Sequence, residues 1–158
     1  MVAEPPFPPG DIGAASVANA LQSLDREAER VITIAHCQAY RYASDVLASA
    51  HLLLGLLAVN PAPVCVTDEP VQCARTVASI RYELERIMGD EWQVDGPPRI
   101  LHLPYTPHAR AILVNAAGLG RNAEPAGTTP AHLWAALAAA SGSVAARGLA
   151  ALGLTPRL

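Results

Sequence analysis

Apolar residues recur at helical spacing in two stretches of the chain that are 81 residues apart. The segment from Leu24 to His51 aligns with the segment from Tyr105 to His132 without a gap. In each copy, apolar or small residues fall at positions i, i+3, i+4, i+7 and i+11, which predicts an amphipathic helix with one buried face. These positions hold Ala28, Val31, Ile32, Ala35 and Ala39 in the first copy and Ala109, Ile112, Leu113, Ala116 and Gly120 in the second.

A second helix is predicted in each copy, after a connection of small residues. Ser49 and Thr129 are placed to accept hydrogen bonds from the free N–H groups of its first turn, and Pro130 suits the first helical position. One such unit cannot bury its apolar stripe alone. We therefore expect an all-α fold in which the two repeats are related by a pseudo-twofold axis and form one compact bundle.

Proline and glycine indicate where the helices end and how the chain is organised. We expect residues 1–16, which are rich in proline, to form a disordered arm, and residues 17–154 to form one domain. The domain divides into a first repeat at about 21–89, a linker at 90–104 and a second repeat at 105–154. Further expected features are a helix break at 60–63, a helix at 71–88 closed by Gly89, a turn at 141–143 and a helix at 144–152 closed by Gly153.

Composition excludes several classes of function. The chain has 158 residues and a net charge of −3, and all of its basic side chains other than histidine are arginine. Without lysine there is no Walker A phosphate loop and no Schiff-base chemistry. The arginines are scattered, which argues against nucleic-acid binding. The apolar stretch at 52–59 is too short to cross a bilayer and no signal peptide is apparent, so we expect a cytoplasmic protein with no membrane association. Because alanine-rich cores pack closely, we expect a monomer.

Histidine and cysteine are the remaining candidates for chemistry. His51 and His132 occupy equivalent positions, which suggests a metal or catalytic pair, but their place in the first turn of a core helix favours hydrogen bonds to backbone across the repeat boundary. We expect no metal, cofactor or catalytic residue, and hence no enzyme. Cys37 is expected to be a core or boundary thiol. Cys65 and Cys73 flank a turn and could approach each other, but the sequence leaves their pairing open.

Several strings follow one another along the chain: Leu24–Ala28, Ala50–Leu57, Tyr105–Arg110, Ala131–Trp134 and Gly142–Leu149. In this order and spacing they resemble the Clp N-terminal domain, the double Clp repeat of ClpC- and ClpA-type AAA+ unfoldases. In that family a repeat begins with Phe-Thr-x-Arg-Ala, continues to Thr-Glu-His-Leu-Leu-Leu-Gly-Leu and often closes with Gly-x-Val-Ala-Ala-Arg-x-Leu-x-x-Leu-Gly. The resemblance covers residues 21–154. The matching strings are Leu24-Asp25-Arg26-Glu27-Ala28, Ala50-His51-Leu52-Leu53-Leu54-Gly55-Leu56-Leu57, Tyr105-Thr106-Pro107-His108-Ala109-Arg110, Ala131-His132-Leu133-Trp134 and Gly142-Ser143-Val144-Ala145-Ala146-Arg147-Gly148-Leu149.

The resemblance implies a protein-recognition domain. In the unfoldases this domain docks adaptors and substrates and delivers them to the ATPase ring and its peptidase. No ATPase module follows in this sequence, so we expect the chain to act by binding, either as a free-standing accessory or as a piece of a larger protein.

The chain departs from the family pattern in two places. The glutamate of the Thr-Glu-His string, which binds phosphorylated arginine in some members, is Ala50 in the first copy and Ala131 in the second. Because the carboxylate that pairs with a guanidinium is lost, we expect phosphoarginine recognition to be absent or weak. The closing string of the first copy is replaced by the proline- and cysteine-bearing segment 60–73.

The resemblance also implies a ligand-binding groove where the beginnings of the two repeats meet, which in relatives binds peptides and cyclic-peptide antibiotics. Apolar positions would form its floor, while Glu29 and Arg110 would orient a peptide at its rim. The opposing interpretation is that these side chains only pack their own helices or face solvent. The matching positions are Leu21, Leu24, Glu29, Tyr105, Arg110 and Val114.

Three classes of function remain open from the sequence. The first is a decoy or adaptor that binds peptides, cyclic-peptide antibiotics or an unfoldase partner. The second is a structural accessory subunit of a Clp peptidase assembly. The third is a small-molecule-binding regulator that reuses the fold.

Overall fold

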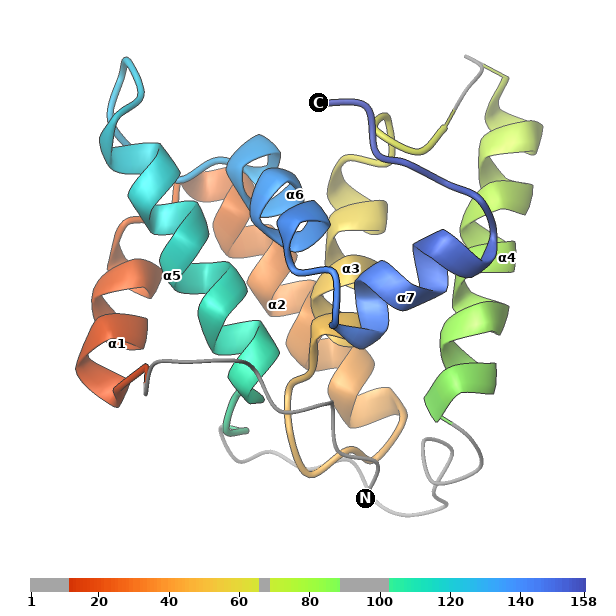
Figure 1. Cartoon of the computed structure of the whole chain (residues 1–158), viewed down its shortest axis with the longest axis horizontal. Coiled ribbons are helices and arrows are strands. Elements are labelled where there is room, and N and C mark those ends of the chain that lie inside the picture. Colours follow the sequence, from red (N-terminus) through yellow and green to blue (C-terminus); the bar gives the residue numbers. More distant parts are fainter. Residues whose placement is uncertain (1–11, 66–68, 89–102) are drawn as a thin grey trace.

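The computed structural model describes residues 12–65, 69–88 and 103–158. These residues contain seven helices and no strand, which confirms the all-α class (Figure 1). The first helix begins at Ala14, so residues 14–16 belong to a helix rather than to the expected arm. Residues 1–11 of that arm, Gly89 and most of the linker lie outside the described residues, whereas Ile12 and Gly13 lead directly into the first helix. The helices are α1 (Ala14–Gln22), α2 (Arg26–Arg41), α3 (Ser49–Val59), α4 (Pro70–Met88), α5 (Pro107–Arg121), α6 (Pro130–Ala139) and α7 (Val144–Ala151).

The predicted apolar faces are buried. All five positions predicted on α2 and all five predicted on α5 are buried in the structure. Helix α3 is apolar on every side and is buried along nine consecutive residues, 49–57. A helix without a polar face must lie in the middle of the fold. The core is therefore built around α3.

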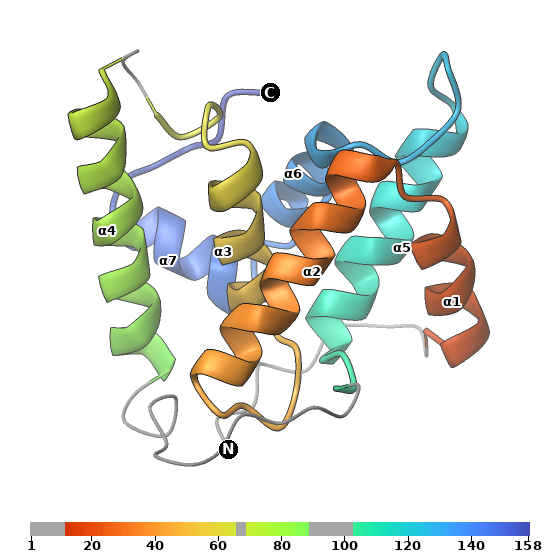
Figure 2. The same cartoon turned by 180° about the vertical axis from the view of Figure 1, so that it is seen from behind.

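Figures 1 and 2 show α1 and α5 at one side of the molecule, α4 at the other side, and α3 between them. Within each repeat the first two helices pack together, α2 on α3 and α5 on α6, and α3 contacts α6 between the repeats. Helix α4 packs on α7 at one side of the molecule. Helix α1 precedes the first repeat in sequence but packs against α5 of the second. One side of the bundle thus joins α4 of the first repeat to α7 of the second, and the other side joins α1 to α5 of the second repeat.

Two isolated parallel β-bridges join the repeats, Leu24 with Thr128 and Leu47 with Tyr105. Adding 81 to Leu24 gives Tyr105 and adding 81 to Leu47 gives Thr128, so the offset of the repeat exchanges the two bridges. The same offset exchanges their hydrogen bonds, which is direct structural support for the pseudo-twofold relation. The four bonds are Asp25 N–H to Thr128 O (2.9 Å), Thr128 N–H to Ser23 O (2.9 Å), Thr106 N–H to Leu47 O (3.0 Å) and Leu47 N–H to Pro104 O (2.9 Å).

The start of α3 differs from the prediction. Thr129 does cap α6, and Pro130 is its first residue. In the first repeat, however, the cap position is Ala48, and Ser49 already lies inside α3. The Ser49 hydroxyl instead accepts a hydrogen bond from the Ala145 N–H, 3.2 Å away in the first turn of α7. Ser49 therefore connects the two repeats rather than capping its own helix.

The remaining helix ends follow the sequence signals. Helix α3 stops at Val59 before the prolines, and residues 141–143 form the turn that precedes α7. Gly153 follows α7 with a φ of +67°, a conformation that glycine adopts without strain. In the described ranges no single helix is long and apolar enough to cross a membrane. Helices α6 and α7 reach that length and composition only together, with an 81° bend between them.

Candidate functional site

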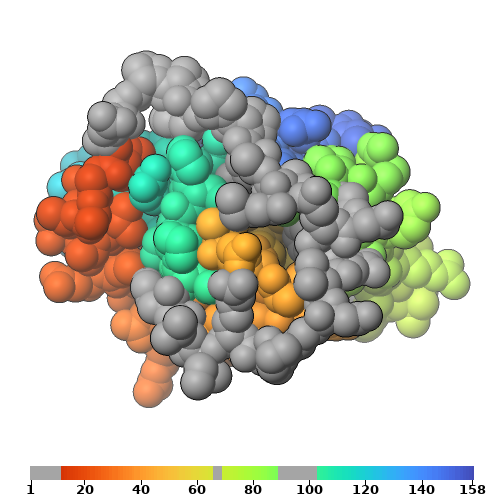
Figure 3. Space-filling view, turned by 90° about the horizontal axis from the view of Figure 1, so that it is seen from below, coloured from red at the N-terminus to blue at the C-terminus, as the bar shows by residue number. Residues whose placement is uncertain are grey.

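A pocket of about 300 Å³ lies between α1 and the segment that leads into α5. It contains three of the six predicted site residues, Leu21, Tyr105 and Arg110. Figure 3 shows α1 (red) and the beginning of α5 (teal) side by side on the lower face of the molecule. The other residues that line the pocket, none of them predicted, are Ala14, Val17, Ala18, Leu103 and Pro104.

Tyr105 is held in place by an aromatic cluster on α2. Its hydroxyl lies 3.2 Å from Nε2 of His36, within hydrogen-bonding distance. The two rings meet edge to face with their centroids 5.8 Å apart, and His36 also lies 6.1 Å from the Tyr40 ring. Burial, with a smaller contribution from Tyr40, raises the pKa of Tyr105. The phenol therefore stays neutral at physiological pH and offers the pocket an aromatic ring fixed in orientation.

Arg110 brings a positive charge to a largely apolar pocket. It lies in the first turn of α5 and is partly buried. Its Nε is buried and has no hydrogen-bond partner among the described residues. Salt bridges found among those residues involve other arginines. A guanidinium in this position can donate to a carboxylate or carbonyl group of a bound molecule.

The other three predicted residues lie outside this pocket. Leu24 is engaged in the β-bridge to Thr128, and Val114 lines a separate hollow of about 170 Å³ that also borders α1. Glu29 is exposed on α2. It is the repeat mate of Arg110, so the pseudo-twofold places it at the equivalent position of a different helix. Of the two residues expected at the rim of the groove, Arg110 lines this pocket and Glu29 does not.

The contribution of α1 and of the residues just before α5 was not predicted. Val17, Leu21 and Leu24 recur at helical spacing in the sequence, but that spacing does not show that α1 packs on the second repeat. Leu103 and Pro104 directly precede Tyr105. Their adjacency to a predicted site residue was the available signal for them.

The paired histidines have a local structural role. Nδ1 of His51 accepts the Ala48 N–H at 2.9 Å, and Nδ1 of His132 accepts the Thr129 N–H at 3.0 Å. Each ring thus binds the backbone at the start of its own helix. Among the described residues, no group of three or more histidine, cysteine or acidic side chains could hold a metal ion.

His51 should make stability depend on pH. Burial, and more weakly the charge of His36, lower the pKa of His51 from 6.5 to about 3. The folded state therefore binds fewer protons than the unfolded state below pH 6.5, and stability present above that pH is lost as the pH falls toward 3. Between pH 7 and 5 we expect a loss of about 2 kcal/mol in the free energy of unfolding.

Denaturant titrations at both pH values test this, with His51→Gln as the matched variant. Glutamine at the third helical position can accept the same N–H but does not titrate, so its pH dependence should be smaller by that amount. An equal pH dependence in the two proteins would show that His51 is not the responsible group.

Three other residues singled out from the sequence are placed as follows. Ala50 is fully buried, whereas its mate Ala131 is exposed. Cys37 is a free, exposed cysteine on α2, so the expected core or boundary position is wrong. It lies within an amphipathic helix but falls on the outer face of that helix.

Comparison with known proteins gives one structural result. No protein-family model and no curated protein sequence matches the chain. Among solved structures, the chain is similar to the N-terminal domain of the caseinolytic protease associated chaperone ClpD from Arabidopsis thaliana, with a TM-score of 0.63 and 21% sequence identity. The match covers 84% of this chain and 86% of that one. Together with the exchanged bridges of the two repeats, this shows that the chain has the fold of a Clp N-terminal domain.

Proposed function

We propose that this chain is a non-catalytic peptide- or protein-binding module of the Clp proteolysis system, with the pocket between α1 and α5 as its ligand site. The observation that carries the proposal is an apolar pocket, on this fold, that contains an arginine with no salt bridge to the described residues. The similar ClpD domain belongs to a protease-associated chaperone, which supports a place in the same system.

The walls of the pocket suggest the chemistry of its ligand. Leu21, Val17 and the Tyr105 ring offer apolar contact, and Arg110 offers the charged donor. An apolar or aromatic side chain next to a carboxylate or backbone carbonyl would satisfy both. Such pairs of groups occur in unfolded peptides and in cyclic peptides.

As a small monomer, the chain would serve as a decoy that sequesters peptides or cyclic-peptide antibiotics, or as an adaptor that also contacts an unfoldase. Cytoplasmic localisation is part of this proposal. A decoy needs only the pocket, whereas an adaptor needs a second surface. Pull-down with purified unfoldase and peptidase separates these roles from that of a structural peptidase subunit, because only the last predicts stable co-purification with the peptidase.

Calorimetric titration with a cyclic peptide that binds unfoldase N-terminal domains tests the pocket. Replacing Tyr105 with alanine removes the ring and should weaken binding about tenfold or more. Tyr82→Ala is the matched control, because Tyr82 is a 69% exposed tyrosine on α4 and does not line the pocket. The affinity of the Tyr82→Ala variant for the cyclic peptide should equal that of the unmodified chain.

Two outcomes would contradict this site. One is unchanged affinity in a Tyr105→Ala variant whose circular dichroism and unfolding transition remain native-like. The other is an equal loss of affinity in both tyrosine variants. Absence of any heat of binding to the unmodified chain would direct the search to a protein partner.

A further inference from the structure

The first half of α4 contributes no buried side chain to the fold. The buried residues of α4 are Ile80, Glu83, Leu84 and Met88, all in its second half. Every residue from Pro70 to Ser79 is exposed or partly exposed. Within this segment only Val77, which is partly buried, packs against the hydrophobic core. Hydrophobic burial, the main force that holds a surface helix on its core, is therefore weak over this segment.

Polar contacts do not replace the missing burial. The second half of α4 is attached to α2 through Arg81, which donates to Gln38 Oε1 at 2.9 Å and to the Tyr42 hydroxyl at 2.7 Å. In the first half, the one side-chain hydrogen bond found among the described residues joins Thr76 to Gln72 within the same helix. The first half thus has no such attachment to another described helix.

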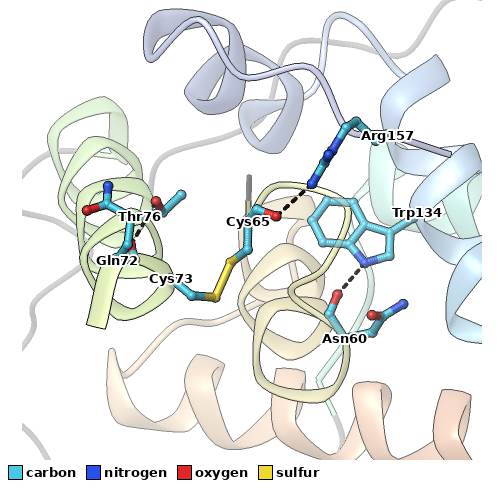
Figure 4. Close-up of a disulfide and its surroundings, with 7 residues drawn as sticks. All are labelled: Asn60, Cys65, Gln72, Cys73, Thr76, Trp134 and Arg157. Atoms are coloured by element: carbon cyan, nitrogen blue, oxygen red, sulfur yellow. Dashed lines mark hydrogen bonds between the residues drawn. A yellow bond between two sulfur atoms is a disulfide. The ribbon is translucent and has the colours of Figure 1, made fainter. Parts of the chain in front are cut away.

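A disulfide supplies the attachment. Cys73 in the first half of α4 is bonded to Cys65 in the segment after α3, with their Cα atoms 5.2 Å apart (Figure 4). The sequence left this pairing open, and the structure shows it. Cys65 is 9% exposed, whereas Cys73 is partly exposed on its helix.

The two ends of the disulfide differ in how firmly they are held. The Cys65 carbonyl accepts a hydrogen bond from the Arg157 guanidinium at 2.7 Å, and the Pro63 carbonyl accepts the Arg157 backbone N–H at 2.8 Å. The Asn60 carbonyl accepts the indole N–H of Trp134 at 2.9 Å. Figure 4 shows the Arg157 guanidinium and Trp134 contacts on the Cys65 side of the bond. Breaking the disulfide would leave Cys65 anchored and Cys73 on a helix segment with little else to fix it.

From this asymmetry we propose that Cys65 and Cys73 form a site of reversible thiol–disulfide exchange that controls the order of the first half of α4. Its substrates are dithiols, either small molecules or reduced protein dithiols. In a cytoplasmic protein, as the sequence led us to expect, disulfides are usually transient or redox-sensing, which agrees with a reversible bond. This inference does not depend on the ligand pocket.

The exchange begins at the more accessible sulfur. A thiolate of the dithiol attacks Sγ of Cys73, the S–S bond breaks, and Cys65 leaves as a thiolate that takes up a proton. The second thiol of the reagent then attacks the mixed disulfide and releases Cys73 as a thiol. The protein disulfide is reduced by two electrons and the dithiol is oxidised to its own disulfide.

Hydrogen exchange measured by mass spectrometry on the whole chain, with and without dithiothreitol, tests the proposal. Reduction should speed amide exchange in peptides spanning Pro70–Ser79 about tenfold or more, because a short helix with little burial is marginal in water. Peptides from Ile80–Met88 and from α7 should keep their protection. Reoxidation should restore the original pattern.

Alkylation and substitution complete the test. Before reduction, iodoacetamide should modify Cys37 alone among the cysteines, and after reduction all three. The double variant Cys65→Ser/Cys73→Ser should exchange like the reduced protein and should not respond to dithiothreitol, while Cys37→Ser should respond like the unmodified chain. Three reactive thiols in the purified, unreduced protein would overturn the proposal. So would unchanged protection of Pro70–Ser79 on reduction, or loss of protection across all helices.

Discussion

Replacing Trp134 with alanine is expected to lower the free energy of unfolding by about 3–5 kcal/mol. Among the described residues, Trp134 is the largest fully buried side chain, and its exposed fraction is 0%. Its truncation leaves a cavity between α6 and the neighbouring helices, which include α3, and these helices can move in to fill it only partly. It also removes the indole N–H that satisfies the Asn60 carbonyl at 2.9 Å.

Chemical denaturation followed by circular dichroism measures this loss. Because a loss of that size is a large fraction of the stability of a typical domain, Trp134→Phe serves as a variant that should still fold. Phenylalanine keeps most of the apolar contact but not the N–H, so its cost should be about 1–2 kcal/mol. A cost below about 1 kcal/mol for Trp134→Ala would mean that this part of the core is loosely packed.

Adding a single methyl group at Gly55 is expected to cost about 3 kcal/mol or more. A Cβ at this position of α3 would lie 2.4 Å from the Val31 carbonyl oxygen and 3.3 Å from the Ala35 N of α2. Both atoms are backbone, so neither can rotate away and the two helices must separate. The cost arises even though alanine is a better helix former than glycine by about 1 kcal/mol.

Gly118→Ala provides the matched control for Gly55→Ala. Gly118 lies within α5, and the nearest atom to a methyl group added there would be the Arg121 guanidinium nitrogen at 3.8 Å. With room for the methyl group, the propensity gain should remain, and the variant should be more stable by up to about 1 kcal/mol. Denaturation curves for the two variants should therefore shift in opposite directions. Shifts in the same direction would contradict the close approach of α2 and α3.

Periodicity was sufficient to predict the helices and their buried faces. The apolar positions from Ala28 to Ala39 are buried because a 3.6-residue repeat leaves only one face that can meet the core. The predicted start of α3 is wrong because serine is a common N-cap residue, whereas alanine is not. The repeat offset aligns Ala48, not Ser49, with the capping residue Thr129.

Five of the eight residues that line the pocket could not be predicted from the sequence, because the pocket depends on packing between segments that are distant along the chain. Arg110 lines the pocket since α1 packs against α5, but its mate Glu29 lies in the first turn of α2, which does not line the pocket. Leu24 was expected at the floor of the groove; its backbone forms a β-bridge with Thr128, and it does not line this pocket. A family pattern identifies equivalent positions, but it does not show which neighbouring helix each side chain meets.

Because the two β-bridges join one repeat to the other, we expect the smallest unit that can fold to contain both repeats. A truncated chain holding one repeat would keep the Leu47 N–H and carbonyl, or those of Thr128, but lose the backbone that pairs with them. Unpaired backbone groups at a buried position are costly, so such a half would tend to associate with a second half. We therefore expect a deletion to preserve folding only if it keeps both repeats, since each repeat supplies backbone partners to the other.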